Sequence, residues 1–113
     1  MAVIDISDKI TKLDSFEERV GVSLESLSVF LKDDNPDRIS LEICGEIQTT
    51  VGTKLQQNIS IVFDVYDTSG RIVWTDSMFC FANTFFGFLT FSESVHVPTT
   101  TISKIRIYPK KKW

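Results

Sequence analysis

Residues 59–75 read ISIVFDVYDTSGRIVWT, and this stretch decides the fold class. Large apolar residues stand at every second position of its first half: Ile59, Ile61, Phe63 and Val65. This period of two is typical of a β-strand with one buried face, because successive side chains point to opposite faces. The tetrapeptide Asp67–Gly70 predicts a hairpin loop in which Gly70 takes a positive φ. Arg71–Thr75 is then expected to return as the partner strand.

The same alternation continues on both sides of this hairpin. In the preceding segment the apolar positions are Ile39, Leu41, Ile43 and Ile47. Gly45 occupies the position between the last two, where we expect a bulge or a close crossing. The chain contains seven or eight such segments, separated by turns about every 8–12 residues, as in sandwiches and small barrels. The sequence therefore predicts an all-β, antiparallel two-sheet sandwich whose core includes Ile43, Ile61, Phe63 and Val65.

One part of this pattern is similar to a known family. The stretch Ile59–Gly70 resembles the FxLYD-type bacterial immunoglobulin-like modules, in which an alternating strand ends in a Tyr-Asp pair and a glycine turn. Here the pair is Tyr66-Asp67, and the turn ends at Gly70. The later segment 105–109, which ends in Pro109, fits the same pattern. The resemblance implies an immunoglobulin-like sandwich with a non-catalytic role, and it transfers no functional residue.

Length and spacing indicate one domain, because 113 residues are too few for two good cores. We expect residues 1–21 to form an N-terminal arm or short helical turn, residues 22–109 the β-sandwich, and residues 110–113 a basic tail. Two interpretations of the arm stay open. Val3–Ile6 reads as a short edge strand, whereas the following apolar residues recur at near-helical spacing: Ile10, Leu13, Phe16 and Val20.

The formal net charge of −3 argues against a nucleic-acid partner, although the C-terminal end is locally basic. No stretch approaches the roughly 18 apolar residues of a membrane-spanning helix, and no secretion signal is visible at the N-terminus. The sequence as written predicts a cytoplasmic protein, or a cell-envelope protein if a leader has been removed. Cys44 falls in the polar phase of its strand and should face outward, so we expect Cys44 and Cys80 to be free thiols.

The residues that could carry chemistry are few. Asp33, Asp34 and Asp37 form an acidic turn that could, with Asp67 on a second loop, supply oxygen ligands to calcium. The alternative function is therefore a calcium-dependent, C2-like binder of lipid or another ligand, although turn geometry alone also explains these residues. His96 stands between two valines and is expected to face solvent. With no recognisable catalytic motif, we expect no enzyme activity, no metal and no cofactor.

Aromatic residues crowd the segment from Met78 to Phe91. A turn at Asn83-Thr84 would reset the strand phase and take most rings into the core. Without that reset, some rings would form an exposed apolar patch of the kind that marks an interface. The candidate interface residues are Phe79, Phe81, Phe86 and Phe88. The expected partner is a protein, and a second copy of the chain in a homodimer is one possibility.

Overall fold

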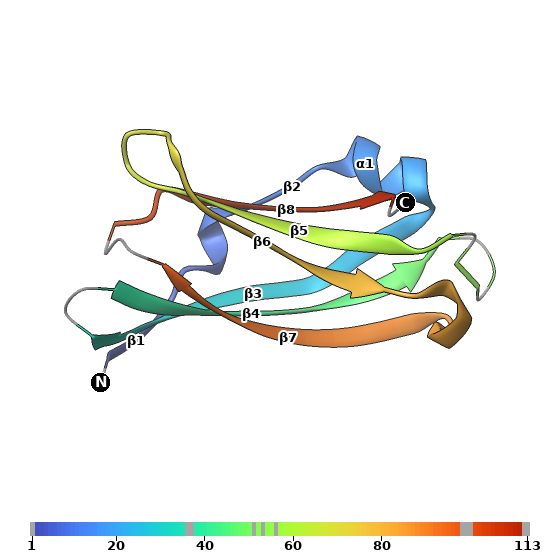
Figure 1. Cartoon of the computed structure of the whole chain (residues 1–113), viewed down its shortest axis with the longest axis horizontal. Coiled ribbons are helices and arrows are strands. Elements are labelled where there is room, and N and C mark those ends of the chain that lie inside the picture. The colour runs from blue at the N-terminus through green and yellow to red at the C-terminus, as the bar shows by residue number, and fades with distance from the viewer. Residues whose placement is uncertain are drawn as a thin grey trace.

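Two four-stranded sheets face each other in the computed structural model (Figure 1). The structure describes residues 2–35, 38–50, 52, 54–55, 57–97 and 101–111, without the side chains of residues 2, 33–35, 38 and 84. The first sheet has the order β1-β3-β4-β7 and the second the order β2-β8-β5-β6. The strands of the first sheet are β1 (Ala2–Asp5), β3 (Val22–Asn35), β4 (Arg38–Thr49) and β7 (Phe88–Val97). Those of the second are β2 (Ile10–Lys12), β8 (Lys104–Lys111), β5 (Ile59–Tyr66) and β6 (Ile72–Cys80).

The predicted all-β, two-sheet architecture is confirmed. The described pairings are antiparallel with one exception, since β2 runs parallel to β8. Both interpretations of the N-terminal region are realised in succession. Residues 2–5 form β1, and a short 3₁₀ helix, η1 (Ser7–Lys9), leads into β2. Helix α1 (Asp14–Val20) then precedes β3. Lys110 and Lys111 belong to β8, while residues 112 and 113 of the expected basic tail lie outside the described residues.

The core lies between the sheets and comes from the alternating positions of their central strands. The four residues chosen from the sequence are all buried, at 0 to 1 % exposure: Ile43, Ile61, Phe63 and Val65. The ring of Phe63 reaches across to Phe91 of the other sheet, with 6.1 Å between centroids. The core prediction is therefore confirmed.

Gly45 marks a close crossing, as its position in the apolar phase indicated. It lies directly opposite Phe91 in the β4–β7 pair. A Cβ atom at Gly45 would stand 2.5 Å from Leu27 Cδ2 and 2.9 Å from Phe91 Cζ. The missing side chain thus makes room for the Phe91 ring against β4.

The hairpin between β5 and β6 forms as expected. Gly70 has a φ of +85°, and its N–H donates to the carbonyl of Asp67 at 3.1 Å. The Asp67 N–H in turn donates to the carbonyl of Arg71 at 2.9 Å. The return strand is longer than the expected Arg71–Thr75, since β6 begins at Ile72 and continues to Cys80.

Helix α1 is fixed by an acidic residue that the sequence did not single out. Glu17 is buried, and its Oε1 accepts the backbone N–H of Leu24 at 2.8 Å. The same oxygen lies 3.6 Å from Lys12 Nζ. Phe16 packs edge-on against Tyr108 of β8, with 5.3 Å between centroids. These contacts attach the N-terminal region to both sheets.

The cysteines are free, as expected. Cys44 lies on the outer face of β4, and Cys80 is buried at the end of β6, where burial raises the pKa of its thiol. Among the described residues, no helix is long and apolar enough to cross a membrane.

Candidate functional site

Four phenylalanine rings are exposed at one end of the sandwich, where β6 passes into β7 (Figure 1). We call this set the aromatic corner, and its exposed fractions are 52 % for Phe79, 44 % for Phe81, 82 % for Phe86 and 63 % for Phe88. These are the four residues that the sequence proposed for an interface. Phe79 and Phe81 lie 6.5 Å apart between centroids, so their rings form part of one surface.

The local backbone explains why these rings are not all buried. A short 3₁₀ helix, η2 (Ala82–Thr84), does reset the strand phase near Asn83, and Asn58 Oδ1 accepts the N–H of Ala82 at 2.9 Å. This turn sends Phe85 and Phe91 into the core. The other rings remain outside, because the segment leaves the edge of one sheet and enters the edge of the other. The turn and the exposed patch, treated as alternatives in the sequence, occur together.

A shallow groove runs along the outer face of β5 beside the aromatic corner. It has a volume of about 530 Å³, with Ser60 and Val62 on its floor. Phe79 and Ser77 line the β6 side, while Lys110 lines the β8 side. The groove is open to solvent and adds a mixed polar and cationic rim to the aromatic surface.

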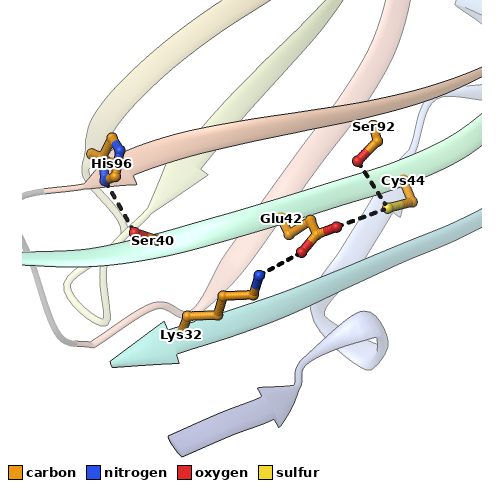
Figure 2. A network of polar contacts seen from close by, with 6 residues as sticks. All are labelled: Lys32, Ser40, Glu42, Cys44, Ser92 and His96. Atoms are coloured by element: carbon orange, nitrogen blue, oxygen red, sulfur yellow. Dashed lines mark hydrogen bonds and ion pairs between the residues drawn. The ribbon is translucent and has the colours of Figure 1, made fainter. Parts of the chain in front are cut away.

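Polar side chains cover the outer face of the β3–β4–β7 sheet (Figure 2). Lys32 Nζ lies 2.8 Å from Glu42 Oε2, and the hydrogen bond and charge of this lysine hold the pKa of the Glu42 carboxyl below its ordinary value. The Cys44 sulfur lies 3.5 Å from Ser92 Oγ and 4.0 Å from Glu42 Oε1. These groups satisfy one another across neighbouring strands on a face open to water.

The same face holds a serine–histidine pair. Ser40 Oγ lies 3.0 Å from His96 Nδ1, and the two residues stand directly opposite each other in the β4–β7 ladder (Figure 2). The distance suits a nucleophile and its base, but such a base needs a third group to orient it. Among the described residues, no carboxylate forms an ion pair with the His96 ring. The pair is therefore best explained as a cross-strand polar contact, and His96 faces solvent as expected.

The four candidate calcium ligands are not brought together by any described contact. Asp33 and Asp34 belong to β3, but their side chains lie outside the described residues, as does the whole of Asp37. Asp67 lies in the β5–β6 hairpin, on the other sheet at the same end of the molecule (Figure 1). Within the described part of the chain, no three acidic, cysteine or histidine side chains are arranged to hold a metal ion.

The Asp67 carboxylate is already engaged within its own turn. Its Oδ1 accepts the Ser69 hydroxyl at 2.6 Å, the Ser69 N–H at 2.9 Å and the Arg71 N–H at 3.0 Å. These bonds hold the pKa of Asp67 below its ordinary value, chiefly through the Ser69 hydroxyl. The observed role of Asp67 is therefore to shape the hairpin.

Comparisons with known proteins add no further guide to the site. No family model, no curated protein and no solved structure matches the chain.

Proposed function

We propose that this protein is a non-catalytic interaction module that binds a protein partner through the aromatic corner. The observation that carries the proposal is the exposure of four phenylalanine rings from one short segment at one end of the sandwich, each at least 44 % exposed: Phe79, Phe81, Phe86 and Phe88. Phe79 lies on the outer face of one sheet and Phe88 on the outer face of the other, so a partner would contact this end of the sandwich on both sides. Burying a whole phenylalanine side chain contributes about 1.5–3 kcal/mol, so covering these four partly exposed rings would be strongly favourable. Aromatic residues in such clusters are typical anchors of protein interfaces.

The character of the remaining surface supports a binding role over catalysis. Several described polar groups of the β3–β4–β7 face are paired with one another, as in the Lys32–Glu42 ion pair. The Ser40–His96 pair lines a small hollow of about 230 Å³ on this face, and no described carboxylate forms an ion pair with His96 that would orient it as a base. The aromatic corner is thus the described surface whose burial by a partner would be most favourable.

We use the term immunoglobulin-like for the two-layer architecture of the proposed module. The arrangement of two packed sheets, with the first strands divided between them, supports this description. The order of pairing differs from that of a constant immunoglobulin domain, in which strands A, B, E and D form one sheet and C, F and G the other. Here β3 pairs with the strand that follows it, whereas the second strand of a constant immunoglobulin domain pairs with the fifth.

Chemical cross-linking in a lysate of the native cells, read by mass spectrometry, tests the proposal. The bait proteins are the wild type, Phe86→Asp, Phe88→Asp and the control Ser94→Asp, whose site is exposed on β7 outside the aromatic corner. We expect a partner protein that cross-links near the corner to the wild type and the control, and to neither phenylalanine variant. Circular dichroism verifies that every bait is folded. If the partners of the phenylalanine variants match those of the wild type, the corner is not the docking surface.

A further inference from the structure

Exposed apolar side chains also lie outside the aromatic corner, on β6 and at the start of β7. Nine large apolar side chains are exposed among the described residues, and seven of them lie between Ile72 and Leu89. This segment contains β6 and the start of β7, which are the edge strands of the two sheets on that side (Figure 1). The apolar surface therefore coincides with an open pair of sheet edges.

We propose that a second copy of the chain covers this side, with the β6 strands of the two copies paired antiparallel about a two-fold axis at Ser77. The proposal rests on the proposed function and names its partner. It joins the two β2-β8-β5-β6 sheets into one continuous sheet across the dimer.

The edge of β6 carries only part of the usual protection against such pairing: one charge, Asp76, opposite the core residue Phe63, and one irregularity in its pairing with β5, between Ile72 and Trp74. Within the described residues, no strand lies beyond β6 in its sheet. Edge strands are commonly kept apart by lysine, proline or short length. The nine residues of β6 include no lysine, arginine or proline, and Asp76 is their one charged residue. By contrast, β2 has three residues and ends in Lys12, and β7 carries Glu93 near its middle.

Asp76 determines the register of the pair. In an antiparallel pair about a two-fold axis, the residue at the axis faces its own copy. An axis at Asp76, the midpoint of β6, would place two carboxylates face to face, which destabilises a sheet. Residues on the same face must pair, so the nearest axes that separate the carboxylates are Thr75 and Ser77. The axis at Ser77 pairs residues 74–80 and so avoids the irregularity between Ile72 and Trp74. Asp76 then lies opposite Met78.

This register also brings the apolar ends of the strand together. The start of β6 carries Trp74, which is 40 % exposed, and its end carries Phe79, which is 52 % exposed. An axis at Ser77 places Trp74 opposite Cys80 and Phe79 opposite Thr75. Continued past the strand, it brings Phe81 of one copy beside Val73 of the other. These three exposed apolar groups thus meet the β6 region of the second copy, so this part of the strand is complementary to itself.

The apolar area that this pairing covers is small. Taking about 200 Å² for a whole large side chain, the exposed parts of Trp74, Phe79 and Phe81 offer roughly 270 Å² on each copy. Even with the paired backbone of the strand, this is below the roughly 800 Å² that a standard interface buries on each partner. The expected dimer is therefore weak and reversible.

One hydrogen bond opposes the pairing in the free chain. Asp76 Oδ1 accepts the backbone N–H of Ser77 at 2.8 Å, so the donor at the axis is satisfied within its own strand. In the dimer a backbone carbonyl of the second copy takes the place of this carboxylate. Asp76 therefore weakens the association that the rest of β6 favours.

Sedimentation equilibrium of the purified full chain over a concentration series tests the dimer. We expect a Kd of about 10–100 µM for the wild type, as for a modest interface. Ser77→Lys places two ammonium groups at the axis and should raise the Kd at least about tenfold. Asp76→Ala removes the competing acceptor and should lower the Kd by about tenfold. The control Ser94→Lys adds the same charge to β7 and should leave the Kd within about twofold.

A disulfide test fixes the register independently. Directly opposite residues in an antiparallel pair have Cα atoms about 4.5–5.5 Å apart, within the range that a disulfide spans. In a Cys44→Ser background, mild oxidation should link two Ser77→Cys chains and should not link two Ser94→Cys chains. Cys80 does not interfere, because it is buried and its thiol pKa is raised.

A wild type that stays monomeric up to about 500 µM, far above that Kd range, overturns the inference. A dimer that Ser77→Lys does not weaken, or in which Ser77→Cys does not cross-link, also overturns it. The proposed function fails separately, when Phe86→Asp and Phe88→Asp lose no partner in the lysate. If the chain is monomeric but still binds another protein through the aromatic corner, the dimer is refuted and the proposed function is not.

Discussion

Truncation of Phe63 is the sharpest test of the sandwich core. Phe63 lies in the middle of β5, is 1 % exposed and has the largest side chain among the fully buried residues. Its ring packs toward Phe91 of the opposite sheet. Phe63→Ala therefore removes a contact that joins the two layers. It also leaves a cavity between the sheets, because other residues hold both sheets in place.

The cost can be worked out from two contributions. Moving a phenylalanine ring out of water contributes about 1.5–3 kcal/mol, which the alanine variant loses. A cavity costs about 24 cal/mol for each Å³ that the neighbours do not refill, so roughly 80 Å³ left empty adds about 2 kcal/mol. We expect a total loss of about 3–5 kcal/mol in the free energy of unfolding. That is a large part of the roughly 5–15 kcal/mol of a typical domain.

Urea unfolding followed by circular dichroism measures this loss. Phe86→Ala is the matched control, because the same atoms are removed from a ring that is 82 % exposed. The control should change the free energy of unfolding by less than about 0.5 kcal/mol. Both variants are measured at the same low protein concentration, so that association contributes little. A loss below about 1 kcal/mol for Phe63→Ala would refute the assignment of Phe63 to the contact between the sheets.

Three further perturbations test the turns and the close crossing. Gly70→Val forces a β-branched residue to a φ of +85° and should lower the free energy of unfolding in urea by at least about 1–2 kcal/mol. An unchanged stability would show that the turn does not require a glycine at this position. Gly45→Ala places a methyl group within 3 Å of Leu27 and Phe91 and should cost about 1–3 kcal/mol, and a stabilised variant would contradict the close crossing. Because the pKa of Asp67 is below its ordinary value of 3.8 in the folded chain, its contribution is present above that value and is lost as the pH falls through the folded pKa. The free energy of unfolding of Asp67→Asn should therefore fall less than that of the wild type between pH 5 and the acid limit. Equal losses would show that the Asp67 carboxylate does not stabilise the hairpin.

The central strands could be predicted from the sequence because their surroundings are uniform. Strands β4 and β5 each have a strand on both sides, so the residues in their apolar phase are covered by the opposite sheet. Ile43 and Val65 are fully buried for this reason. The hairpin was also predictable, since Asp67 and Gly70 have local preferences that need no knowledge of the rest of the fold.

The edge strands could not be assigned in the same way. Trp74 lies directly opposite Val65 and on the same face, yet it is 40 % exposed while Val65 is buried. The difference arises because β6 is at the edge, where the opposite sheet does not fully cover it. Glu17 was missed for a related reason: its burial depends on β3 and Lys12, and nothing in the local pattern of α1 distinguishes it from an exposed acid.

The division between central and edge strands also separates stability from binding. All eight residues of β5 are buried, including Asp64, whose carboxylate accepts the Thr75 hydroxyl at 2.7 Å. In β6, by contrast, Ser77 and Phe79 are exposed. Substitutions in β5 should therefore act on the free energy of unfolding, while those at the exposed positions of β6 should leave folding nearly unchanged. A loss of association caused by Ser77→Lys in a chain that unfolds like the wild type can then be assigned to the lost contact, because the folded monomer does not depend on that surface.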